Sequence, residues 1–262
     1  MQIYTHTLPG GAQLIGYLRD RTVEMPAFNT RPAILILPGG GYAWCSKREA
    51  DPVAMQFLQA GYNVFTLYYT CRSDETVPAL RWQPLIDAAG AILHIRRNAE
   101  QFGTDPAKIA ICGFSAGGHL AASAATMLPE EVRPAFAVLV YPVITAEPGK
   151  CHKGSFDNLL GTDRTAGDEA QWSLQNRVTA STPPALLLAA DDDRSVPPVN
   201  SVLFYAALKR HGIPASLRIY PSGGHGGALD PAHIYRAQWR ADILDWLAML
   251  AHENQKPTSK PR

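Results

Sequence analysis

The stretch KIAICGFSAGGHLAAS, residues 108–123, decides the fold of this chain. It opens as an apolar run typical of a buried strand, passes through Gly-x-Ser-x-Gly at residues 113–117, and continues as an alanine-rich segment that favours a helix. Glycines on both sides of Ser115 permit a strained turn and let the helix pack closely on the strand. The pattern predicts a strand–turn–helix unit that holds the Ser115 hydroxyl at the tip of a sheet.

Strands alternate with helices along the rest of the chain. Apolar, β-branched runs predict strands in residues 12–20, 62–70, 134–143, 184–191 and 215–221, and residues 31–42 are predicted to form a short buried strand that runs into a glycine loop. Helical periodicity and terminal Pro or Gly residues predict helices in residues 51–61, 83–103, 116–128, 198–212 and 233–253. We therefore expect an α/β fold with a mostly parallel sheet covered by helices on both faces. Such sheets place their sites at the carboxyl ends of the strands.

Three of these strand ends carry a serine, an acid and a histidine, in that chain order. Ser115 is the candidate nucleophile, and a serine hydroxyl needs an adjacent base to take its proton. His225 is the candidate base, since it alone of the eight histidines lies at a strand's carboxyl end downstream of the acid. A buried carboxylate would fix the tautomer of that imidazole and stabilise its charged form.

The acid comes from a run of three aspartates, Asp191, Asp192 and Asp193. All three cannot lie buried against one imidazole. The spacing to Val196 and Pro197 favours Asp193, and Asp192 is the alternative. The remaining carboxylates are expected to cap the next helix or to bind loop amides.

The glycine run at residues 39–41 follows an early strand and lets backbone N–H groups approach a ligand closely. We assign Gly40 and Gly41, with the amide of Ala116, to an oxyanion hole. A phosphate-binding loop is disfavoured, because no Lys-Ser/Thr pair follows and the Gly-x-Gly-x-x-Gly pattern is absent after that strand. A plain turn is the remaining alternative.

Composition gives no indication of several classes of partner. A net charge of +1 gives no reason to expect nucleic acid or an acidic membrane surface, and no apolar run is long enough to span a membrane. The N-terminus lacks the pattern of a secretory signal. The four cysteines show no CxxC pair and no zinc spacing, so we expect free thiols, a cytoplasmic location, no metal and no cofactor.

With these residues assembled, the chain resembles an α/β-hydrolase of the acetyl-esterase and acetylxylan-esterase-like group, which is related to the hormone-sensitive-lipase family. The resemblance rests on the glycine-loop, serine and acid–histidine segments, LPGGGYAWCSKREADPVAMQFLQAGYNVFTLYY, ICGFSAGGHLAAS and PPALLLAADDDRSVPPVNSVLFYAALKRHGIPASLRIYPSGGHG, and on the short SFDNLLGTD. It implies Ser115, Asp193 and His225 as a catalytic triad. Pro38 replaces the histidine of lipase-like relatives, as in the small acetyl-esterase branch.

We expect a single domain over residues 1–252 and a polar tail over 253–262. An irregular insertion at about 145–182 would form a small lid over a shallow acyl pocket, which suits acetyl groups. Tyr42 and Trp44 are expected to line the alcohol side, where aromatic rings stack on sugars, although core or rim packing is the alternative for both. An ion pair of Arg48 with the next residue, Glu49, would hold the glycine loop.

The favoured function is a serine carboxylesterase that removes short acyl groups, chiefly acetyl, from carbohydrate such as xylan. Its partner would be a small-molecule or oligosaccharide ester, and the protein a monomer or small homo-oligomer. Two alternatives stay open. A small peptidase of the same fold would release dipeptides, and a silent homologue would bind an ester without turnover.

Overall fold

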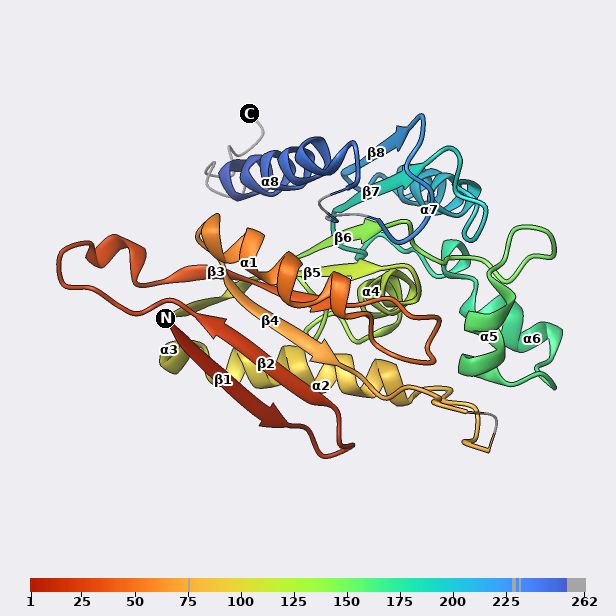
Figure 1. The fold of residues 1–262 in the computed structure, drawn as a ribbon, viewed down its shortest axis with the longest axis horizontal. Helices are drawn as coiled ribbons and strands as arrows, with labels where there is room; N and C mark the ends of the chain where they lie inside the picture. The colour runs from red at the N-terminus through yellow and green to blue at the C-terminus, as the bar shows by residue number, and fades with distance from the viewer. Residues whose placement is uncertain (75, 228–229, 231, 254–262) are drawn as a thin grey trace, which may run out of the picture.

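A single mixed sheet forms the centre of the structure, a computed structural model that describes residues 1–253 except 75, 228–229 and 231. Its strands are β1 (Gln2–Thr7), β2 (Gln13–Leu18), β3 (Arg31–Leu37), β4 (Asn63–Tyr68), β5 (Thr104–Phe114), β6 (Phe136–Val140), β7 (Ala185–Ala190) and β8 (Ala215–Tyr220). They lie in the order β1-β2-β4-β3-β5-β6-β7-β8 (Figure 1).

Six of the eight strands, β3 to β8, run parallel to one another. Leu35 of β3 pairs with Phe65 on one side and with Ile111 on the other. These strands read as continuous apolar runs because both of their faces are buried. The predicted α/β fold class is confirmed.

The antiparallel pair β1 and β2 closes one edge of the sheet. β2 was expected, whereas β1 was not. Its sequence, QIYTHT, is mostly polar, and the strand is largely exposed. An edge strand of this kind carries no apolar run from which to predict it.

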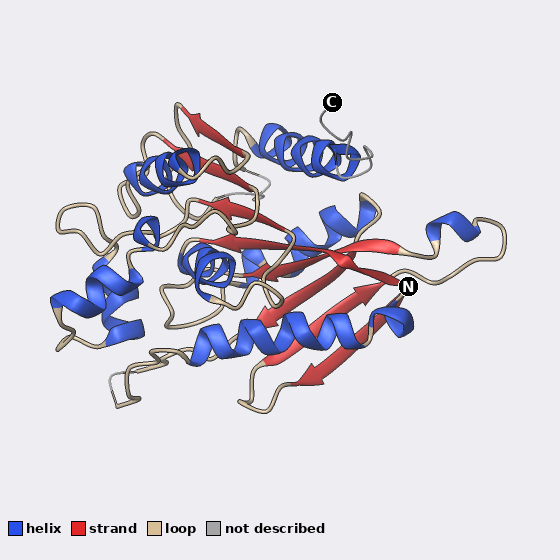
Figure 2. Ribbon diagram, turned by 180° about the vertical axis from the view of Figure 1, so that it is seen from behind, coloured by secondary structure: helices blue, strands red, loops and turns tan. Residues whose placement is uncertain are grey.

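Helices cover both faces of the sheet, and each face has its own core. They are α1 (Asp51–Gln59), α2 (Gln83–Arg97), α3 (Ala99–Phe102), α4 (Ala116–Met127), α7 (Val199–Arg210) and α8 (Arg236–Glu253), with short 3₁₀ turns η1 (Pro26–Phe28) and η2 (Lys47–Glu49). Leu35 of β3 belongs to the core on the side of α2, α4 and α7, whereas its neighbour Ile36 belongs to the core on the side of α1 and α8. In Figure 2, which views the molecule from behind, α2 lies in front of the strands.

The segment between β6 and β7 carries three short helices, α5 (Lys153–Leu160), α6 (Ala166–Trp172) and η3 (Leu174–Asn176). α6 begins with a capping box in which Thr165 and Asp168 satisfy each other's backbone amides. α5 and α6 lie at the end of the sheet toward which its parallel strands point (Figure 1). This segment corresponds to the expected insertion, which is therefore placed next to the site.

The expected single domain over residues 1–252 stays a prediction. The expected tail, 253–262, lies outside the described residues except for Glu253, the last residue of α8. No helix in the described part of the chain combines the length and the apolarity that a membrane span requires.

Candidate active site

Ser115 occupies the sharp turn between β5 and α4. Its backbone has φ 53° and ψ −117°, a combination that residues other than glycine rarely adopt. The flanking glycines allow this turn, because a Cβ at Gly113 would lie 2.2 Å from the Gly117 carbonyl oxygen. A Cβ at Gly117 would lie 2.1 Å from the Leu37 carbonyl oxygen of β3. The strain is thus held by close packing of strand, turn and helix.

The structure brings Ser115, His225 and Asp193 together in one chain of hydrogen bonds. His225 Nε2 lies 2.8 Å from Ser115 Oγ, and His225 Nδ1 lies 2.7 Å from Asp193 Oδ2. Asp193 is 4% exposed, and its other oxygen accepts the amides of Ser195 and Val196, both at 2.9 Å. The carboxylate is therefore fixed in orientation and aims one oxygen at the imidazole.

The neighbouring aspartates lie elsewhere. Asp192 Oδ1 accepts the amide of Gly224 at 2.8 Å, which holds the pKa of that carboxyl below its ordinary value. The Asp191 side chain is exposed. Of the two candidates for the acid, the geometry places Asp193 against His225 and leaves Asp192 as a brace for the loop that carries His225.

The glycine loop faces the Ser115 hydroxyl across a pocket, which both Gly40 and Gly41 line. Their φ values are 127° and 64°, and a Cβ at Gly40 would lie 2.1 Å from the Trp44 carbonyl oxygen. Within the described residues, the amides of Gly40, Gly41 and Ala116 meet no hydrogen-bond acceptor. The Ala116 amide also opens helix α4, whose N-terminal end favours negative charge. These three donors are available to an oxyanion.

Glu49 holds the glycine loop through the interior of the protein. Its Oε2 accepts the Gly39 amide at 2.7 Å, and its Oε1 accepts the Tyr141 hydroxyl at 2.6 Å. Burial raises the pKa of Glu49 above its ordinary value. The expected ion pair with Arg48 is wrong, since no such pair occurs within 4.0 Å among the described residues.

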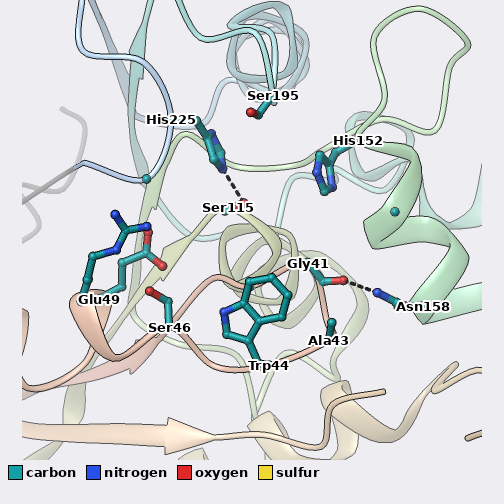
Figure 3. Close-up of a pocket in the computed structure, with 14 residues that line it drawn as sticks. Gly41, Ala43, Trp44, Ser46, Glu49, Ser115, His152, Asn158, Ser195 and His225 are labelled. Carbon is teal, nitrogen blue, oxygen red and sulfur yellow. Dashed lines mark hydrogen bonds between the residues drawn. The ribbon is translucent and has the colours of Figure 1, made fainter. Parts of the chain in front are cut away.

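The pocket above Ser115 has a volume of about 360 Å³. Its walls come from the glycine loop, the insertion and the loops after β7 and β8: Gly40, Gly41, Ala43, Trp44, Ser46, Arg48, Glu49, Ser115, His152, Gly154, Asn158, Ser195, His225 and Gly226 (Figure 3). Trp44 is 63% exposed and presents its indole to the pocket, and its contact with the alcohol part of a substrate stays a prediction. In the described part of the chain, no group of three or more His, Cys, Asp or Glu side chains is placed to hold a metal ion.

Tyr42 does not line the pocket, so its expected contact with substrate is wrong. The side chain is 1% exposed, and its hydroxyl donates to His119 Nδ1 at 2.8 Å. His119 Nε2 in turn donates to the Trp172 carbonyl oxygen at 3.0 Å. Because a buried acceptor satisfies the Tyr42 hydroxyl, the ring turns into the core, where its edge meets Tyr69.

The insertion supplies two pocket residues that the sequence did not reveal. His152 is the N-cap of α5, and Asn158 of the same helix donates from Nδ2 to the Gly41 carbonyl oxygen at 2.9 Å (Figure 3). Ser195 lines the pocket from the loop after β7. The insertion has no periodic pattern, and the Asn158 contact joins residues that lie 117 positions apart. Only the folded chain identifies these neighbours.

Two family models match the chain. Residues 91–253, more than half of the chain, match the prolyl oligopeptidase family, and residues 23–134 match the family described as BD-FAE. An acetyl ester-xyloside bifunctional hydrolase from Caldicellulosiruptor lactoaceticus is 33% identical with a TM-score of 0.83, and the match covers 93% of this chain and 90% of that one. The chain belongs to the α/β-hydrolases, within the prolyl oligopeptidase family. The predicted resemblance to this superfamily is confirmed.

This α/β-hydrolase is also similar to two curated proteins of greater length. The acetylxylan esterase of Xylanibacter ruminicola is 36% identical over 244 residues, which are 91% of this chain and 48% of that protein. The endo-1,4-beta-xylanase B of Butyrivibrio fibrisolvens is 37% identical over 225 residues, 81% of this chain and 34% of that protein. The chain therefore spans half or less of the length of these relatives.

Proposed function

We propose that this α/β-hydrolase is a serine carboxylesterase that removes short acyl groups, chiefly acetyl, from carbohydrate such as xylan or its oligosaccharides. The observation that carries the proposal is the chain of hydrogen bonds from Ser115 through His225 to the buried Asp193. It ends in a pocket lined by Gly40 and Gly41, whose amides meet no acceptor among the described residues. The similarity to an acetylxylan esterase and to an acetyl ester-xyloside hydrolase supports the choice of acyl group and alcohol.

Acylation begins when Ser115 Oγ attacks the carbonyl carbon of the ester and His225 Nε2 takes the hydroxyl proton. Asp193 accepts a hydrogen bond from His225 Nδ1 and stabilises the positive charge on the ring. The carbonyl oxygen becomes an oxyanion and binds the amides of the glycine loop and of α4. The ester C–O bond then breaks, His225 returns the proton to the leaving alcohol, and the acyl group stays on Ser115.

Deacylation repeats the same steps with water. His225 Nε2 takes a proton from a water molecule, and the resulting hydroxide attacks the carbonyl of the acyl-serine. The oxyanion again binds the backbone amides. When the bond to Ser115 Oγ breaks, His225 returns the proton to the serine, and acetic acid leaves and releases its own proton to the solvent.

The pocket favours a compact, polar alcohol. A volume of about 360 Å³ accommodates one sugar ring with a short acyl group, and Trp44 offers an exposed face on which a ring can stack. The other pocket walls carry polar side chains, among them Ser46, Asn158 and Ser195.

The proposal extends to partners and location. It assigns a small-molecule or oligosaccharide ester as partner, with no role for nucleic acid or membrane, no cofactor, and a monomer or small homo-oligomer. A cytoplasmic location is supported by the four cysteines, which are free thiols. Fractionation of the producing cells tests the location, and light scattering tests the oligomeric state.

The experiment that tests the function compares initial rates on p-nitrophenyl acetate, butyrate and octanoate. We expect acetate to react fastest, and we expect Ser115→Ala to lower kcat by about a thousandfold or more, as loss of a triad member does. Ser123→Ala is the matched control, because Ser123 lies in the same helix and donates to the His119 carbonyl oxygen inside the core. Equal rates for Ser115→Ala and wild type would exclude the mechanism.

The peptidase and binding alternatives have their own readouts. A dipeptidyl p-nitroanilide tests for peptidase activity, which the family match makes a relevant comparison. Turnover of this amide that is faster than turnover of the acetate ester would overturn the esterase proposal. Saturable binding of an acetylated xyloside without release of acetate would favour a silent homologue.

A further inference from the structure

The insertion places a second histidine, His152, in the wall of the pocket that holds Ser115 and His225. Its Nδ1 lies 3.3 Å from the Ser155 backbone nitrogen and 2.8 Å from Ser155 Oγ. A backbone N–H can only donate, so Nδ1 is the acceptor of both bonds. Burial lowers the pKa of His152, which keeps the ring neutral. The ring proton of His152 therefore resides on Nε2.

That Nε2–H is a fixed donor without a protein acceptor. The two bonds from Ser155 hold the ring at the N-terminus of α5, and in the described part of the chain no acceptor meets Nε2. Figure 3 shows His152 and His225 on either side of the pocket, with Trp44 on a third side. A donor held in this way in a ligand pocket is satisfied by an oxygen of the substrate or by water.

The acyl part of an acetyl ester offers His152 nothing to bind. Its one acceptor, the carbonyl oxygen, belongs to the amides of the glycine loop, and the methyl group has no polar atom. An acceptor for His152 within the substrate therefore comes from the alcohol part. In a sugar, apart from the bridging ester oxygen that His225 protonates, the nearest such oxygen is the hydroxyl on the carbon next to the ester.

We propose that His152 is a substrate-binding residue whose Nε2–H donates to a free hydroxyl oxygen adjacent to the ester. The inference rests on the proposed function and narrows its substrate class to esters of vicinal diols, such as partly acetylated sugars with an unmodified neighbouring hydroxyl. Trp44 stacks on the face of the sugar ring, and His152 binds a hydroxyl group at the edge of the same ring. Simple alkyl esters lack the second contact.

A matched pair of small esters tests this inference, cyclohexyl acetate and trans-2-hydroxycyclohexyl acetate, which differ by one hydroxyl group. We expect wild type to prefer the hydroxylated ester in kcat/KM by about tenfold or more, as one hydrogen bond in a desolvated site provides. His152→Asn should abolish the preference, so that its kcat/KM values for the two esters agree within about twofold. Asparagine is a good N-cap, so α5 keeps its first turn.

Two further variants complete the design. His152→Gln carries a longer amide donor and should restore part of the preference. His211→Asn is the control, because His211 is an exposed residue at the end of α7, outside the pocket. Equal wild-type rates on the two esters, or an equal loss on both in His152→Asn, would overturn the inference while leaving the esterase proposal standing. Failure of wild type to hydrolyse either ester would instead overturn the proposed function.

Discussion

At the scale of single residues, three identical side chains in a row have three different environments. Asp193 is buried between His225 and two loop amides. Asp192 lies at the surface and binds the amide of Gly224, while Asp191 is exposed. The backbone turns sharply after β7, so only one of the three carboxylates can reach the imidazole.

Paired substitutions test this division of roles. Asp193→Asn should lower kcat by about ten-thousandfold, because the amide favours the wrong tautomer of His225. Asp192→Asn should lower kcat by less than about tenfold, since it only loosens the loop around Gly224. Steady-state rates on p-nitrophenyl acetate give both numbers. A larger loss in Asp192→Asn than in Asp193→Asn would reverse the assignment of the acid.

Glu49 allows a second test at this scale. Glu49→Ala removes the acceptor of the Gly39 amide and should lower kcat/KM about a hundredfold by misplacing the adjacent amides. Glu49→Gln should lower kcat/KM far less, since the glutamine oxygen can accept from the Gly39 amide and the glutamine NH2 group can donate to the Tyr141 oxygen. Rates on p-nitrophenyl acetate measure the difference, with circular dichroism as the check on folding. Equal losses in the two variants would show that charge, not loop position, matters.

At the scale of elements, the sequence predicted what depends on local pattern. The parallel strands and their helices follow from apolar runs and from terminal Gly and Pro residues, and the residues Ser115, Asp193 and His225 follow from the ends of those strands.

Other features could not be predicted from local pattern. Edge strand β1 was not predicted, because its side chains are mostly exposed. His152 and Asn158 were not predicted as pocket residues, because their place in the pocket depends on contacts between distant segments. Tyr42 was misassigned because its sequence neighbours do not reveal the buried His119 acceptor.

The close packing of α4 against the end of β3 leads to a prediction about stability. Gly117→Ala should destabilise the fold by about 3 kcal/mol or more, because the new methyl group meets backbone atoms of β3 that cannot move aside. Gly90→Ala is the matched control, since Gly90 lies within α2 and its Cβ would meet only Leu8 side-chain atoms at 3.7 Å. That change should stabilise the helix by up to about 1 kcal/mol. Urea unfolding measures both, and equal free energies would contradict the packing argument.

At the scale of the whole molecule, three segments far apart in the sequence meet at His119. The glycine loop contributes the Tyr42 hydroxyl, α4 contributes the imidazole, and the insertion contributes the Trp172 carbonyl oxygen. The ring of His119 also stacks on that of Trp172, with centroids 6.1 Å apart. This chain of contacts joins the insertion to the helix that follows Ser115, so the pocket wall and Ser115 share one support.

The buried ring of His119 makes the stability of the protein depend on pH. Burial lowers the pKa of His119 from 6.5 to about 4, because the folded protein accommodates only the neutral ring. Below pH 6.5 the unfolded chain binds a proton that the folded chain does not bind until about pH 4. The contribution of His119 to the free energy of unfolding is therefore complete above pH 6.5 and falls as pH decreases, by about 2 kcal/mol between pH 7 and pH 5.

His119→Gln isolates this contribution from other titrating groups. Its amide can accept from Tyr42 and donate to the Trp172 carbonyl oxygen, but it binds no proton in this range. Urea unfolding at pH 7 and pH 5 should show a loss of stability that is smaller in the variant than in wild type by about 2 kcal/mol. If both proteins lost the same amount, the His119 ring would have to accept its proton in the folded state, and the contacts with Tyr42 and Trp172 would not hold it neutral.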